Sequence, residues 1–168
     1  AMWNQFRTDE YEGMLAETVT MAGHNGDLIH AYLSRPLGKG PFPGIVLVPH
    51  MPGWDEFYRE TSRRFSQHGY VAICPDIYCR FGHGMPEEIA AKARTTGVSD
   101  DSVVGDCEGA MQYLRALPYS IGKVGMIGGS YVGLTQWQPA IHTPPHLGAI
   151  APMITASDYH DHWTYVNG

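Results

Sequence analysis

Four short runs of consecutive apolar residues constrain the fold of this chain most strongly. They cover residues 44–49, 70–75, 123–128 and 146–153. A short, continuously apolar run indicates a strand that is buried on both faces. Amphipathic segments separate the runs, and strands that alternate with helices predict a mostly parallel sheet covered by helices on both sides. The predicted fold class is therefore α/β with three layers.

Helix signals lie between the runs. In residues 54–69, Asp55 can cap the start of a helix, and Phe57, Thr61 and Phe65 would share one face. Residues 85–97 predict a short second helix with a proline in its first turn. The longest predicted helix covers residues 99–118, and its apolar stripe consists of Val103, Cys107, Ala110, Met111 and Leu114.

An antiparallel hairpin is predicted before the first buried strand. Residues 17–23 and 26–36 alternate apolar and polar side chains, and Asn25 and Gly26 between them are typical of a tight turn. At 168 residues, the chain has the length of one domain.

Composition excludes several classes of function. The net charge is −6 and no cluster of lysine or arginine occurs, so nucleic acid and membrane surfaces are not expected partners. We expect neither a transmembrane helix nor a signal peptide, because no apolar run is long enough and the first residues lack a basic region followed by an apolar core. The three cysteines, Cys74, Cys79 and Cys107, fit a reducing compartment, so a cytoplasmic location is predicted. No cofactor is expected.

Ser130 is the candidate nucleophile. It follows the apolar run 123–128 after Gly129, so a strand would deliver it at a sharp turn where helix N–H groups can stabilise an oxyanion. The general pattern G-x-S-x-G fails by one position, because Val132 stands where the second glycine is expected and Gly133 follows it. On this local pattern, a nucleophile and a serine that only caps a helix stay equally open.

Residues from about 10 to 127 resemble the dienelactone hydrolase family of α/β-hydrolases. The resemblance is carried by PGIVLVPHMPGWDEFYRETSRRFSQHGYVAICPDIYCRFG and by VVGDCEGAMQYLRALPYSIGKVGMIG. Within the first stretch, G-Y-x-A-x-x-P-D-x-Y-x-R, residues 69–80, is the most specific part. This resemblance implies an α/β-hydrolase fold and hydrolysis of esters or lactones.

From residue 128 onward, the chain is similar to the cocaine esterase and X-Pro dipeptidyl-peptidase group, also α/β-hydrolases. Their elbow reads G-x-S-Y-x-G, and residues 128–133 match it throughout. The match implies that Ser130 is the nucleophile. The change of resemblance near residues 125–130 predicts a natural recombinant, an engineered chimera or a misassembled frame. Dienelactone hydrolases usually carry cysteine at the elbow, so lactone-specific chemistry is not implied for this serine.

The resemblance also implies the partners of the nucleophile. Backbone N–H groups of Met51 and Tyr131 would hold the oxyanion, and His50 would lie near Ser130, either as a weak general base or as a loop residue that hydrogen-bonds to backbone. The family order, nucleophile, acid, histidine, places both other triad members beyond residue 168. We therefore expect a chain that lacks the last strands and helices of the fold.

Candidate substrate-binding residues lie in the loops after the first two buried strands. Arg80 matches a family arginine that helps to bind a substrate carboxylate, and a surface ion pair is the alternative. Trp54 and Tyr78, with Phe81, suggest an apolar or aromatic substrate group. Cys79 lies in the same loop. Its thiol could be reactive, or it could be buried and inert.

The terminal segment SDYHDHW offers Asp158, His160, Asp161 and His162. A metal site or a substitute acid–base pair is conceivable there, but a polar surface loop is favoured and no metal is predicted. The predicted function is hydrolysis of carboxylic esters or lactones by a serine nucleophile. The alternative is a catalytically incomplete scaffold that self-associates through an exposed sheet edge after Ile150.

Overall fold

The computed structural model describes residues 13–50, 53, 55–129 and 147–153. They form a six-stranded sheet with the strand order β1-β2-β4-β3-β5-β6. Strands β3, β4, β5 and β6 are parallel to one another, whereas β1 and β2 form an antiparallel hairpin and β2 is antiparallel to β4. The predicted α/β class is confirmed. The strands are β1 (Met14–Ala22), β2 (Leu28–Pro36), β3 (Phe42–Leu47), β4 (Val71–Pro75), β5 (Ser120–Gly129) and β6 (Leu147–Met153).

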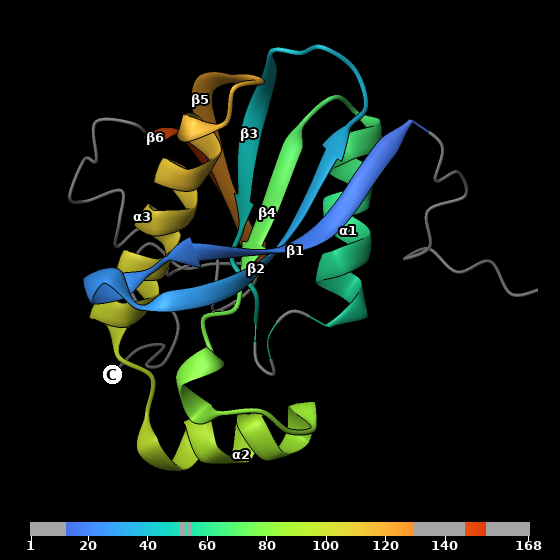
Figure 1. Ribbon diagram of the computed structural model, residues 1–168. Helices are drawn as coiled ribbons and strands as arrows, with labels where there is room; N and C mark the ends of the chain where they lie inside the picture. The colour runs from blue at the N-terminus through green and yellow to red at the C-terminus, as the bar shows by residue number, and fades with distance from the viewer. Residues whose placement is uncertain (1–12, 51–52, 54, 130–146, 154–168) are drawn as a thin grey trace, which may run out of the picture.

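Helices cover both faces of this sheet, as Figure 1 shows. Helix α1 (Glu56–Gln67) packs on β2 and β4, and α3 (Asp100–Ala116) packs on the other face, against β5, β3 and β4. Helix α2 (Pro86–Thr96) lies beyond the end of the sheet from which the loop after β4 emerges. None of the helices among the described residues combines the length and the apolar character needed to cross a bilayer.

Strand β4 separates the two halves of the core. All of its residues are buried, as the continuous apolar run predicts. Val71 and Ile73 belong to the larger cluster, which includes the α3 side, whereas Ala72 and Cys74 belong to a smaller cluster that includes Tyr58 of α1. The predicted apolar stripe of α3 is confirmed, because all five of its residues are buried.

Helix α1 buries a face that the sequence did not single out. Asp55 caps the helix as expected, since its side chain accepts a hydrogen bond from the Tyr58 N–H at 3.3 Å. Phe57, however, is 40% exposed, and the buried positions follow Tyr58 instead, with Ser62 and Ser66 one and two turns later. The Ser66 hydroxyl donates to the Ser34 hydroxyl of β2 at 2.7 Å. Small hydroxyl side chains therefore make this contact between α1 and β2.

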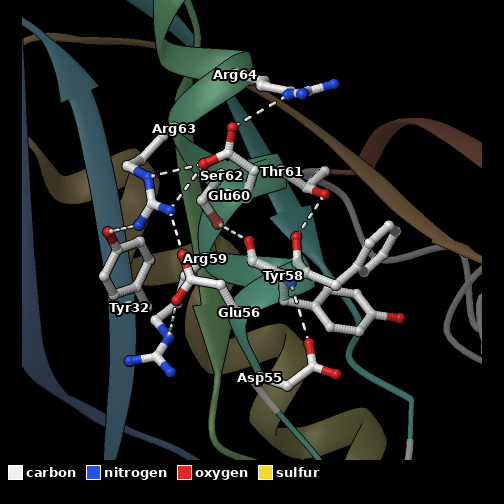
Figure 2. A network of polar contacts seen from close by, with 11 residues as sticks. Tyr32, Asp55, Glu56, Tyr58, Arg59, Glu60, Thr61, Ser62, Arg63 and Arg64 are labelled. Atoms are coloured by element: carbon white, nitrogen blue, oxygen red, sulfur yellow. Dashed lines mark hydrogen bonds and ion pairs between the residues drawn. The ribbon is translucent and has the colours of Figure 1, made fainter. Parts of the chain in front are cut away.

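A buried carboxylate also lies on α1. Glu60 is 1% exposed and accepts hydrogen bonds from the guanidinium groups of Arg63, at 2.8 Å, and Arg64, at 3.2 Å (Figure 2). The same Arg63 donates to the Tyr32 hydroxyl of β2 at 2.9 Å. A buried charge needs such partners, because its desolvation is otherwise unfavourable by several kcal/mol. This network therefore fixes the rotation of α1 on the sheet.

The hairpin rests on α3 at a glycine. Its turn is a short 3₁₀ segment, His24–Gly26, in which Asn25 adopts a φ of 54°. A Cβ atom on Gly109 of α3 would lie 2.0 Å from the carbonyl oxygen of Ala22, which real Cβ atoms do not tolerate. Glycine at this helical position therefore permits the close approach of the hairpin.

Replacing Gly109 by alanine should lower the free energy of unfolding by about 2 kcal/mol, because the new methyl group forces the hairpin away from α3. Intrinsic helix propensity alone would favour alanine by about 1 kcal/mol, so the sign of the change is diagnostic. Urea denaturation measures it, with Gln112→Ala on the exposed face of α3 as the matched control. A stabilised Gly109→Ala variant would contradict the observed packing.

Candidate active site at the carboxyl edge of the sheet

The carboxyl ends of the parallel strands meet at one edge of the sheet, where ligands bind in open α/β sheets. The loop after β3 brings His50 and Gly53 to this edge, and the loop after β4 brings Asp76 and Tyr78. Strand β5 ends at Gly129, the residue directly before Ser130 in the sequence. Four predicted site residues fall outside the described residues: Met51, Trp54, Ser130 and Tyr131. So do the terminal Asp158, His160, Asp161 and His162.

His50 is held by the first turn of α1. Its backbone N–H donates to the Tyr58 hydroxyl at 3.0 Å, and its ring lies against the Tyr58 ring with centroids 5.0 Å apart. Its Nε2 lies 3.9 Å from Oδ2 of Asp55, and its side chain is 46% exposed. Burial raises the pKa of Tyr58 far above its ordinary value, so this hydroxyl stays neutral and keeps accepting the His50 N–H. The imidazole therefore stands at the rim beside a carboxylate.

Tyr78 and Asp76 are positioned together. Oδ1 of Asp76 accepts the Tyr78 N–H at 3.1 Å, and the backbone N–H of Asp76 donates to the His30 carbonyl at 2.8 Å. Burial raises the pKa of Asp76, partly offset by the Tyr78 N–H. Tyr78 itself is buried at 7% exposure, and its ring lies against Gly53, where a Cβ would be 3.2 Å away. The loops after β3 and β4 thus touch each other at the rim.

A cavity of about 500 Å³ opens between these loops and the first turn of α1. Residues from β1, β2, both rim loops, α1 and the α2 region contribute to it. They are Thr18, Tyr32, Gly53, Asp55, Glu56, Arg59, Asp76, Tyr78, Gly84 and Ile89. Of the predicted substrate-binding residues that the structure describes, Tyr78 lines this cavity and His50 and Arg80 do not.

Arg80 forms a clamp with two acidic residues, Asp106 and Asp27. Of the two roles considered for this arginine, this arrangement corresponds to the ion pair. Its two terminal nitrogens donate to the two carboxylate oxygens of Asp106 at 2.8 and 2.9 Å, and its Nε donates to Asp27 at 3.0 Å. Asp106 is fully buried on α3, and it also accepts the His24 N–H of the hairpin at 2.8 Å. A substrate carboxylate could bind Arg80 only by competing with this bidentate pair.

The three cysteines are free thiols. Cys74 and Cys107 are buried in the core, as predicted. Burial raises the pKa of Cys107 to about 12, and it raises the pKa of Cys74 and Cys79 as well. For Cys79, the neighbouring Asp76 carboxylate raises the pKa further. A raised pKa lowers the thiolate fraction at neutral pH, so the inert alternative for Cys79 is favoured.

Several residues at the rim were not singled out by the sequence analysis. Asp55 was predicted only as a helix cap, and Tyr58 and Asp76 received no site role. The sequence signal for Asp106 was a carboxylate one position before Cys107, on the face of the longest helix that carries the apolar stripe. Such a residue requires a buried partner, but the sequence could not show that the partner is Arg80.

Comparison of the chain with known protein families and curated relatives agrees with this architecture. A model of the dienelactone hydrolase family matches residues 29–156, so the chain belongs to that family. It is 34% identical over 122 residues to carboxymethylenebutenolidase of Pseudomonas putida, an alignment that covers 68% of this chain and 51% of the relative. The chain therefore spans about half the length of the curated relatives it matches.

Solved structures show the same fold. A protein described as a dienelactone hydrolase from Klebsiella pneumoniae superposes with a TM-score of 0.71 at 26% identity, covering 84% of this chain and 60% of the other. A CocE/NonD family hydrolase from Staphylococcus aureus gives a TM-score of 0.57 at 19% identity, covering 83% and 27%. This second likeness shows the α/β-hydrolase fold alone. The family match extends past the junction predicted near residues 125–130, and a chimeric origin stays a prediction.

Removal of the Asp106 carboxylate should destabilise the chain strongly. We expect Asp106→Ala to lower the free energy of unfolding by about 3 kcal/mol, because it leaves the Arg80 guanidinium and the His24 N–H without their buried partner. Asp27→Ala removes the exposed partner of the same arginine and should cost at most about 1 kcal/mol. Urea denaturation of both variants checks the ranking, and equal effects would contradict the clamp.

The thiols should react slowly in the folded chain. At pH 8, a disulfide reagent that consumes thiolate should label the native protein at least about tenfold more slowly than free cysteine, because burial raises all three thiol pKa values. In urea, all three cysteines should be labelled at the rate of free cysteine. A native thiol that reacts as fast as free cysteine would contradict the assignment of Cys79 as inert.

Proposed function

We propose that this chain is a serine-type hydrolase of carboxylic esters or lactones, with Ser130 as its nucleophile. The observation that carries the proposal is the position of the G-x-S-Y-x-G segment. In a chain that belongs to the dienelactone hydrolase family, Ser130 follows the last residue of β5, and β5 ends at the same sheet edge as the loops of His50 and Tyr78.

The proposed chemistry is acyl transfer. The Ser130 hydroxyl oxygen attacks the carbonyl carbon while a base accepts its proton, and backbone N–H groups of Met51 and Tyr131 stabilise the oxyanion of the tetrahedral intermediate. The alcohol leaves with a proton, and water then hydrolyses the acyl-enzyme. Each step moves one proton between an oxygen and the base, so the base must be a group that titrates near neutral pH.

His50 is the candidate base among the described residues. Its imidazole stands at the rim, and its Nε2 lies 3.9 Å from the Asp55 carboxylate. From the sequence, this histidine was expected to lack an orienting acid, and the Asp55 carboxylate is the candidate for that role. The family order of nucleophile, acid and histidine gives an alternative, in which both groups follow Ser130 in the chain.

The aromatic residues at the rim are proposed to bind the substrate. Tyr78 lines the cavity, and Trp54 precedes Asp55 in the loop after β3. Together they favour an apolar or aromatic substrate group. The Pseudomonas putida relative is named for a butenolide, which is a lactone, and this supports lactones beside esters as substrates. Arg80 is proposed as a residue that positions the loop, because Asp106 and Asp27 hold its guanidinium.

A scaffold without catalysis is the second candidate. In the described part of the sheet, β6 pairs with β5 on one side and lies at the edge of the strand order. An edge strand can pair with a second copy of the chain. This candidate predicts an oligomer in solution and no turnover, and light scattering together with the labelling below distinguishes it from a hydrolase.

Labelling with a fluorophosphonate tests the nucleophile. We expect one adduct by intact mass, and we expect Ser130→Ala to abolish it, because only an activated serine attacks the phosphorus. If His50 is the base, His50→Gln should slow labelling by about 100-fold or more. Thr61→Ala, an exchange of a hydroxyl residue on α1, serves as the matched control. A folded sample without any adduct would contradict the hydrolase and favour the scaffold.

A further inference from the structure

Two consecutive aromatic residues in the first turn of α1 form an aromatic corner. Tyr58 is 4% exposed and belongs to the smaller core cluster, whereas Phe57 is 40% exposed. Their rings are perpendicular, with centroids 5.1 Å apart. The corner therefore combines one ring that is fixed in the core with one ring that reaches the surface.

The imidazole of His50 lies in this aromatic corner. Its centroid is 5.0 Å from that of the Tyr58 ring, at an interplanar angle of 44°, and 6.2 Å from that of the Phe57 ring, at 75°. Both separations fall in the range of about 4.5–7 Å that aromatic pairs prefer, and the steep angle to Phe57 is that of an edge-to-face contact. Both rings thus pack against the imidazole.

The backbone of His50 is held at both of its polar groups. Its N–H donates to the Tyr58 hydroxyl at 3.0 Å, and its carbonyl oxygen accepts the Gly53 N–H at 2.6 Å. The Tyr58 N–H donates in turn to Asp55, the cap of α1 (Figure 2). Because the backbone is fixed, the imidazole can change its position only by rotation about its side-chain torsions, and the aromatic corner restricts that rotation.

These contacts leave the two nitrogen atoms of the imidazole available. Nε2 lies 3.9 Å from Oδ2 of Asp55, a distance too long for a hydrogen bond, and the His50 side chain is 46% exposed. Within the described parts of the chain, no residue hydrogen-bonds to either ring nitrogen. A general base needs a nitrogen that can take up a proton. Contacts through the rings and the backbone can therefore position a base without blocking it.

We propose that Phe57 and Tyr58 are positioning residues that hold the imidazole of His50 at the rim in one orientation. This inference rests on the proposed function, in which His50 is the candidate base and the orientation serves proton transfer. Orientation matters for such a group, because a displacement of about 1 Å can lower a reaction rate about 100-fold. A half-exposed histidine in a loop would otherwise be distributed among several rotamers.

Nuclear magnetic resonance tests the orientation of the imidazole without any turnover. The ring protons of His50 are identified as the histidine signals that vanish in His50→Gln. We expect nuclear Overhauser effects from these protons to the rings of both Phe57 and Tyr58, and we expect Phe57→Leu to weaken the effect to Tyr58. Ring protons with the chemical shifts of a free histidine, and without a contact to either ring, would overturn the proposal.

A double-mutant cycle shows whether the aromatic corner acts through His50. The rate constant of fluorophosphonate labelling should fall about tenfold in Phe57→Leu and in Tyr58→Phe, which lacks only the hydroxyl that holds the His50 backbone. In the His50→Gln background, each exchange should change the rate by less than about twofold, because the imidazole that they position is absent. A purely structural role would lower the rate equally in both backgrounds, and this result would overturn the proposal.

A rescue and a matched control complete the series. Phe57→Tyr keeps an aromatic ring and should restore the parent rate. Phe65 forms a similar edge-to-face pair with Tyr70, at 5.8 Å and 81°, near the other end of α1. Phe65→Leu breaks that pair away from His50 and should leave labelling unchanged, so equal losses in Phe57→Leu and Phe65→Leu would overturn the proposal. Urea midpoints establish that each variant is folded, and the exposed position of Phe57 keeps the test available if Tyr58→Phe does not fold.

The two measurements separate this inference from the proposed function. Overhauser effects to both rings in a parent chain that forms no adduct would overturn the proposed function, while they would support the placement of the imidazole by the aromatic corner. An adduct that forms at the same rate in the parent chain, Phe57→Leu and Tyr58→Phe would support the hydrolase and overturn the positioning role.

Discussion

The buried carboxylate of Asp106 is the interaction on which the rim of this molecule depends. It accepts two hydrogen bonds from Arg80 and one from the backbone of His24. Three separate parts of the chain, the hairpin, the loop after β4 and helix α3, therefore meet at one side chain. A carboxylate in this position is stable only because all of its partners are in place.

This clamp has a direct consequence for the candidate site. Arg80 follows Asp76 and Tyr78 in the same short loop, so the bond to Asp106 holds the loop that forms one wall of the cavity. The opposite wall is held by α1, where Asp55 caps the helix and Tyr58 fixes the backbone of His50. Rigid elements thus position the polar groups of the rim before any ligand binds.

Much of the architecture could be predicted from the sequence, because its causes are local. Continuous apolar runs predicted the buried strands, and Asp55 marked a helix start that the structure confirms. The buried face of α1 was not predictable in this way, because serine pairs such as Ser34 and Ser66 carry no periodic signal. The clamp was equally hidden, since Arg80 and Asp106 are brought together only by the packing of α3 on the sheet.

Arg80 is a part of the framework that holds the rim. The central claim is that its guanidinium stays with Asp106 when a carboxylate ligand is present. The most direct measurement is a crystal structure of the chain grown with an excess of adipate, a flexible dicarboxylate. We expect Arg80 to remain within hydrogen-bond distance of both Asp106 oxygens. An Arg80 side chain that has left Asp106 and binds an adipate carboxylate would contradict the account.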